Sequence, residues 1–182
     1  MKTRGIELTL ALAVVALTAT SAQAAVETTL TNCTAANEHC GYPGWIEDGG
    51  RKAQHVRNGG PLVSVFAWAE CWPHIDGSYH ADGRLMVFGA AERIDIDYIR
   101  LYKTFKDGRV EMIRDTAPGI QALSGDYSDP RDQMFTTSDV RFSWGGSDTH
   151  TLHVKVKYSL RWNNTFLWTG PYTFSTVKRE VC

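Results

Sequence analysis

Residues 151–162 read TLHVKVKYSLRW, and this stretch decides the fold class. Apolar side chains occupy every second position from Leu152 to Trp162, and polar side chains fill the positions between them. A period of two is typical of a β-strand with one face buried and the other in water. The pattern predicts a half-buried antiparallel sheet and, with similar runs upstream, an all-β domain. It identifies no chemistry.

Five further strands are predicted upstream, with turn signals between them and no run of helical period. They span residues 62–71, 84–91, 94–105, 109–114 and 140–144. A slip in the alternation near Tyr98 predicts a bulge. The stretch from Leu85 to Ile113 resembles the central strands of bacterial immunoglobulin-like or fibronectin-III-like modules. The predicted fold is therefore an antiparallel immunoglobulin-like / fibronectin-III-like sandwich of about seven strands.

The last hairpin can be built in two registers. A two-residue turn at Asn163-Asn164 would expose an aromatic strip like the stacking platforms of sugar-binding modules. A three-residue loop, residues 163–165, instead places the large apolar residues on the buried face, with Val156 beside Tyr172 and Val154 beside Phe174. Exposing four aromatic side chains would forfeit about 1.5–3 kcal/mol of burial each, so the hydrophobic pattern favours the three-residue loop.

Residues 1–24 have the features of a secretory signal peptide. Lys2 and Arg4 precede an apolar run over residues 8–17, and Ala22-Gln23-Ala24 offers a cleavage site. Such a run is too short to span a bilayer, and no later segment is apolar enough to form a transmembrane anchor. The sequence predicts a secreted or periplasmic protein.

The predicted mature chain is nearly neutral. Removal of residues 1–24 takes away Lys2, Arg4 and Glu7, which leaves 158 residues with a net charge of −2. A basic stripe would be expected of a nucleic-acid-binding protein, so no nucleic-acid partner is predicted. The length suits a single domain with a substantial core.

Four cysteines in an exported chain indicate two disulfides. We expect Cys33–Cys40 and Cys71–Cys182, although spacing alone leaves three pairings open. Residues 25–60 contain six Gly and one Pro with few alternating apolar positions, and they predict a loop-rich N-terminal segment held by the first disulfide. The sandwich domain is then expected over residues 61–182.

The stretch over residues 71–83 carries the strongest chemical signal. Its imidazoles and carboxylates form two pairs spaced i, i+2, which places both members of a pair on one face of extended backbone. The candidate ligands are His74, Asp76, His80 and Asp82. Such a set suits Zn²⁺ or non-haem iron, and Glu70 could serve as a base beside His74. The alternative is that the Asp-Gly pairs only form turns.

Two weaker candidates remain. The oxygen-rich loop residues Asp126, Asp129 and Asp132 suit Ca²⁺, although their spacing matches no EF-hand. Three aromatic residues in turn-rich or extended segments are candidates for ligand contact, because aromatic side chains dominate recognition surfaces. They are Trp45, Trp72 and Tyr79.

Three functions fit these features. The favoured one is a non-catalytic exported module that binds an extracellular protein or carbohydrate through loops, which carry function on rigid scaffolds. The second is a metal-dependent hydrolase that uses Glu70, His74, Asp76 or His80. The third is a structural or assembly protein that pairs through an edge strand or through the N-terminal segment. Apart from Ca²⁺ or Zn²⁺, no cofactor is predicted, and the oligomeric state is left open.

Overall fold

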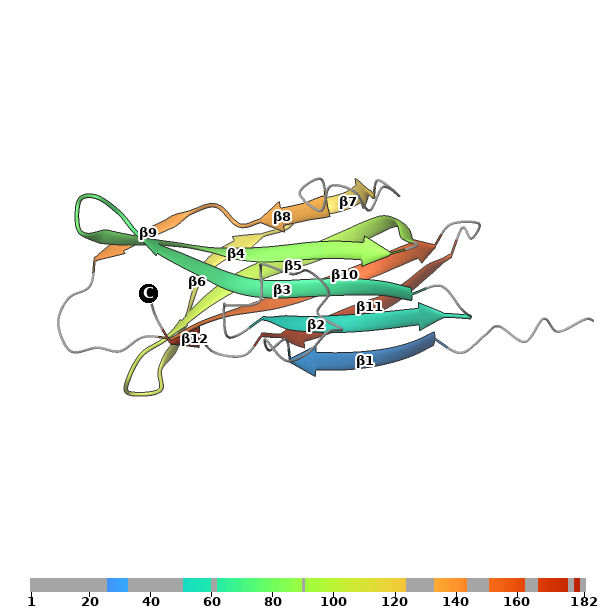
Figure 1. The fold of residues 1–182 in the computed structure, drawn as a ribbon, viewed down its shortest axis with the longest axis horizontal. Helices are drawn as coiled ribbons and strands as arrows, with labels where there is room; N and C mark the ends of the chain where they lie inside the picture. The colour runs from blue at the N-terminus through green and yellow to red at the C-terminus, as the bar shows by residue number, and fades with distance from the viewer. Residues whose placement is uncertain are drawn as a thin grey trace, which may run out of the picture.

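A computed structural model describes residues 26–32, 51–59, 62–89, 91–123, 133–143, 151–162, 167–176 and 179–180. The strands in these ranges form two antiparallel sheets that lie against each other (Figure 1). No helix occurs in the described ranges, so the predicted all-β class is confirmed. For the same residues, no helix is present that could cross a membrane.

Sheet A is an antiparallel meander with an interrupted strand at one edge. Its order is β1-β2-β3-β4, and the short strands β8 and β9 both pair with the far side of β4. The strands are β1 (Val26–Asn32), β2 (Lys52–Asn58), β3 (Leu62–Pro73), β4 (Ser78–Gly89), β8 (Met134–Thr136) and β9 (Val140–Ser143). Among the described strands, β1 pairs only with β2, so it forms the opposite edge (Figure 1).

Sheet B is built around two long central strands. Its order is β11-β10-β5-β6; β7 also pairs with β5, and β12 also pairs with β10. The strands are β5 (Ala91–Thr104), β6 (Val110–Thr116), β7 (Gly119–Ala122), β10 (Thr151–Trp162), β11 (Trp168–Ser175) and β12 (Arg179–Glu180). The bulge predicted near Tyr98 is present, because Lys157 pairs with Tyr98 and Tyr158 with Ile96, which leaves one extra residue in β5.

The main core fills the space between the sheets. In β10 the predicted alternation is confirmed, with every even-numbered side chain from Leu152 to Trp162 buried and every odd one partly exposed. Strands β3, β4 and β5 supply most of the rest of this core, with Val56 of β2 and Phe174 of β11. The Tyr158 hydroxyl donates a 2.9 Å hydrogen bond to Oε1 of Gln54, which joins β10 of sheet B to β2 of sheet A.

A second apolar cluster lies on the outer face of sheet A. Ala53, Phe66, Trp68 and Met86 are buried there, and Arg51 lies over the Trp68 ring at 4.5 Å. This cluster explains why the β3 sequence is apolar on both faces. The inward side chains of β3 enter the main core and the outward ones enter the outer cluster.

The register of the last hairpin differs from the predicted one. Val156 pairs with Phe174 and Tyr158 with Tyr172, two residues away from the expected partners. A shift in pairing follows at Gly170-Pro171, where proline has no N–H to give to the ladder. Phe174 is buried, but Trp168 pairs with Arg161 on the outer face and is 39% exposed. The expectation that Trp168 lies on the buried face beside Leu160 is therefore wrong.

Two strands, β1 and β2, occur where the sequence predicted loops. The β1 side chains are largely exposed, so no buried face marks the strand. In β2, Gln54 and Val56 face the main core while Ala53 enters the outer cluster, which removes the simple alternation. The predicted Cys33–Cys40 disulfide falls outside the described residues. Cys71 is disulfide-bonded, but its partner lies outside them too, so the Cys71–Cys182 pairing stays a prediction.

Candidate functional site

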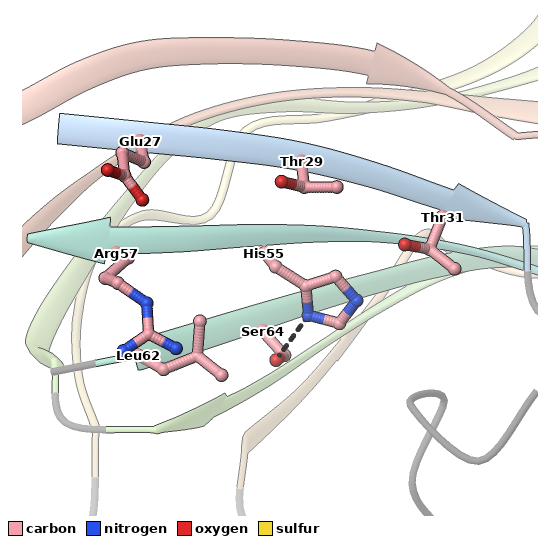
Figure 2. A pocket seen from close by; sticks show the side chains of 7 residues that line it. All are labelled: Glu27, Thr29, Thr31, His55, Arg57, Leu62 and Ser64. Atoms are coloured by element: carbon pink, nitrogen blue, oxygen red, sulfur yellow. Dashed lines mark hydrogen bonds between the residues drawn. The ribbon is translucent and has the colours of Figure 1, made fainter. Parts of the chain in front are cut away.

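A pocket of about 310 Å³ opens on the outer face of sheet A, where β1, β2 and β3 lie side by side (Figure 2). Cross-strand pairing builds it from two rows of side chains, with Thr31 beside them. One row is Glu27, Arg57 and Leu62, and the other is Thr29, His55 and Ser64. We call it the β1–β3 pocket. Its volume lies at the lower end of the range for small-molecule sites.

The lining of the β1–β3 pocket is polar and balanced in charge. Three hydroxyl groups line it, and the Ser64 hydroxyl lies 2.8 Å from Nδ1 of His55. One carboxylate, Glu27, stands directly opposite one guanidinium, Arg57, in the β1–β2 ladder. The half-exposed Leu62 adds apolar surface at the edge. The pocket therefore offers donors and acceptors without a dominant charge.

The Ser64–His55 contact resembles the first half of a nucleophile–base pair. Acyl transfer also needs N–H donors aimed at the oxyanion that develops. Ser64 is the third residue of β3 and is paired with His55 of β2 on one side and with Phe88 of β4 on the other. The backbone N–H groups near Ser64 are therefore used in the hydrogen bonding of β3 to β2 and to β4. This placement favours binding over catalysis.

A second cluster lies at the β3–β4 hairpin, at the far end of the same face. The tight turn over residues 74–78 is closed by hydrogen bonds between His74 and Ser78 and between Gly77 and His74. Oδ1 of Asp76 accepts hydrogen bonds from the Ser78 N–H at 2.9 Å and the Ser78 hydroxyl at 2.5 Å, and it lies 3.1 Å from Nδ1 of His74. Its other oxygen binds Arg141 at 2.5 Å. The Ser78 hydrogen bonds hold the pKa of Asp76 well below its usual range.

His80 completes this second cluster, which we call the hairpin-tip cluster: Trp72, His74, Asp76, His80 and Asp139. Nδ1 of His80 contacts Oδ2 of Asp139, which lies just before β9. The centroid of the His80 ring lies 4.8 Å from that of His74 and 6.0 Å from that of Trp72. Nε2 of His80 is buried and has no hydrogen-bond partner in the described part of the chain.

Asp82 and Glu70 lie further along the outer face and belong to a separate group. Nε of Arg84 donates to Asp82 at 2.9 Å and 3.1 Å, and Nη1 of Arg84 pairs with Glu70. The Trp68 indole N–H also donates to Glu70. Burial raises the pKa of Asp82, and the Arg84 hydrogen bond offsets part of that rise. The structure therefore brings His74, Asp76 and His80 together, whereas Asp82 and Glu70 both form ion pairs with Arg84.

The remaining predicted residues divide into two groups. Trp72 lies beside His80 in the hairpin-tip cluster, and Tyr79 lies opposite Pro73 in the β3–β4 ladder. The other candidates fall outside the described residues; they are Trp45, Asp126, Asp129 and Asp132. No group of three or more His, Cys, Asp or Glu side chains in the described ranges is placed to hold a metal ion.

Sequence reasoning missed the β1–β3 pocket and Asp139. The pocket residues do alternate at i, i+2 within β1 and β2, but those stretches were predicted as loops. Asp139 is 59 residues from His80, and nothing local in the sequence joins the two. Neither a comparison with models of known protein families nor a search of curated proteins finds a match to this chain.

Proposed function

We propose that the chain is a secreted or periplasmic, non-catalytic binding module that takes up an uncharged, hydroxyl-bearing ligand of the saccharide class in the β1–β3 pocket. The observation that carries this proposal is the lining of the pocket. Hydroxyl groups, one imidazole and one pair of opposite charges provide both donors and acceptors, and they leave no net charge to select an ion. A few placed polar groups of this kind fix the orientation of a ligand.

We also propose that the sandwich is of the immunoglobulin-like or fibronectin-III-like type. In immunoglobulin-like sandwiches the second and fifth strands pair in one sheet, and the third, sixth and seventh pair in the other. If β6/β7, β8/β9 and β11/β12 are counted as three interrupted strands, the chain from β3 onward has the same order. Strands β1 and β2 then extend the first sheet and build the pocket. This order supports an immunoglobulin-like or fibronectin-III-like module with an added N-terminal hairpin.

The test is a screen of the full chain against an array of neutral oligosaccharides, followed by calorimetry with the best binder. We expect saturable binding that weakens about tenfold in Ser64→Ala and in Arg57→Ala, because each removes hydrogen bonds worth about 1–3 kcal/mol. The control is Ser175→Ala, a serine exposed on β11 of the other sheet, which should leave binding unchanged.

Two outcomes would contradict the proposal. The saccharide class is excluded if no oligosaccharide binds and the unchanged chain instead binds a protein partner that Ser64→Ala does not bind. The pocket is excluded as the site if a saccharide binds equally well to Ser64→Ala, Arg57→Ala and the control.

A further inference from the structure

The two histidines of the hairpin-tip cluster are held in the same way. Nδ1 of His74 faces the carboxylate of Asp76, and Nδ1 of His80 faces the carboxylate of Asp139. A carboxylate accepts the proton of Nδ1–H, which leaves the lone pair of a neutral imidazole on Nε2. Histidines that bind metals are almost always oriented by such a partner.

The spacing of the two rings fits a shared ion. An ion about 2.1 Å from a ring nitrogen lies roughly 3.2 Å from the ring centre, so two imidazoles on one ion at 90–110° have centres about 4.5–5.2 Å apart. The centres of His74 and His80 are 4.8 Å apart. Nε2 of His80 is also buried without a hydrogen-bond partner in the described part of the chain, which leaves a lone pair for a ligand.

We propose that the hairpin-tip cluster is a site for a divalent copper- or zinc-type ion, with Nε2 of His74 and of His80 as its two protein ligands. Asp76 and Asp139 are positioning residues, and Asp82 takes no part because Arg84 holds it. Asp76 already accepts hydrogen bonds from Ser78 and Arg141, so its oxygens are occupied. With two imidazoles as the only protein ligands, the other coordination positions are filled by water or by a group from solution.

The site is independent of the β1–β3 pocket, and its test uses metal ions alone. The full chain, stripped with EDTA, is titrated by calorimetry with Cu²⁺, Zn²⁺ and Ca²⁺. We expect one Cu²⁺ per chain that is held more tightly than Zn²⁺, and no response to Ca²⁺, since imidazole favours copper and zinc. The electron paramagnetic resonance spectrum of the Cu²⁺ complex should show two nitrogen ligands.

Variants separate this site from other metal-binding positions. His74→Ala and His80→Ala should each weaken Cu²⁺ binding at least tenfold and remove one nitrogen from the spectrum. The matched control is His153→Ala, which changes a histidine on the outer face of sheet B that stacks on Tyr102, and it should leave both readouts unchanged. His74 is 44% exposed on the turn, so its substitution tests the site without a threat to folding.

Asp139 tests the positioning role. Asp139→Asn should weaken Cu²⁺ binding by about 10–100-fold, and Asp139→Glu should recover part of it, because the carboxylate fixes the tautomer of His80. A purely structural role would instead shift the unfolding midpoint of the metal-free chain. The proposal is overturned if no ion binds saturably below millimolar concentration, or if binding is unchanged when His74 and His80 are both replaced by alanine.

Discussion

The hydrogen bond between Tyr158 and Gln54 is the sharpest test of how the two sheets are joined. Tyr158 is fully buried in β10, Gln54 is 6% exposed in β2, and their side-chain oxygens are 2.9 Å apart. Tyr158→Phe keeps the buried ring but leaves Oε1 of Gln54 without its donor. A buried acceptor left unpaired costs about 1–3 kcal/mol. A loss of about 2 kcal/mol lowers the unfolding midpoint of a chain of this size by roughly 4–8 °C.

Urea unfolding followed by circular dichroism measures this loss and its origin. Gln54→Leu alone should be similarly destabilising, because it leaves the Tyr158 hydroxyl without its acceptor. The double variant should lose less stability than the sum of the two single losses. The expected coupling is about 0.5–3 kcal/mol. Tyr172→Phe is the control, since no hydrogen bond is made by that hydroxyl in the described part of the chain, and it should change stability by less than about 0.5 kcal/mol. Additive single variants, or a neutral Tyr158→Phe, would refute the reasoning.

Three further predictions concern the register of the last hairpin, two glycines of positive φ and the hairpin tip. Phe174→Ala should lower the free energy of unfolding in urea by about 3–5 kcal/mol, whereas Trp168→Ala should lower it by less than about 1 kcal/mol. Equal losses of stability would contradict the observed register. Gly89→Ala should be far more destabilising in the same assay than Gly108→Ala, since both have positive φ but a Cβ at Gly89 would lie 2.3 Å from a backbone oxygen. The pKa of Asp76 is lowered below its ordinary 3.8, so its ionised form adds stability above pH 3.8 that is lost as the pH falls further. The difference in free energy of unfolding between the unchanged chain and Asp76→Asn should therefore shrink in acid. A difference that stays constant with pH would contradict this prediction.

How well a strand can be predicted from this sequence depends on what covers each of its two faces. The alternation in β10 is visible in the sequence because its outer side chains are partly exposed to water while its inner ones are buried in the main core. In β2 both faces are partly covered, so Ala53 and Val56 are both buried and the period of two disappears. The register of β11 failed for another reason. Hydrophobic pattern sets the face that is buried, but the pairing shift at Pro171 turns Trp168 to the outside.

The hairpin-tip cluster illustrates what local spacing can establish about a site. The i, i+2 spacing placed His80 and Asp82 on one face, as found, but it did not decide which neighbour each carboxylate contacts. Arg84 follows Asp82 by the same spacing on the same face and takes that carboxylate. His80 instead meets Asp139, which the pairing of β9 with β4 brings alongside from 59 residues away. Spacing therefore identifies both imidazoles and the carboxylate of Asp76 beside His74, whereas the carboxylate that orients His80 is determined by the strand pairing of the sheet.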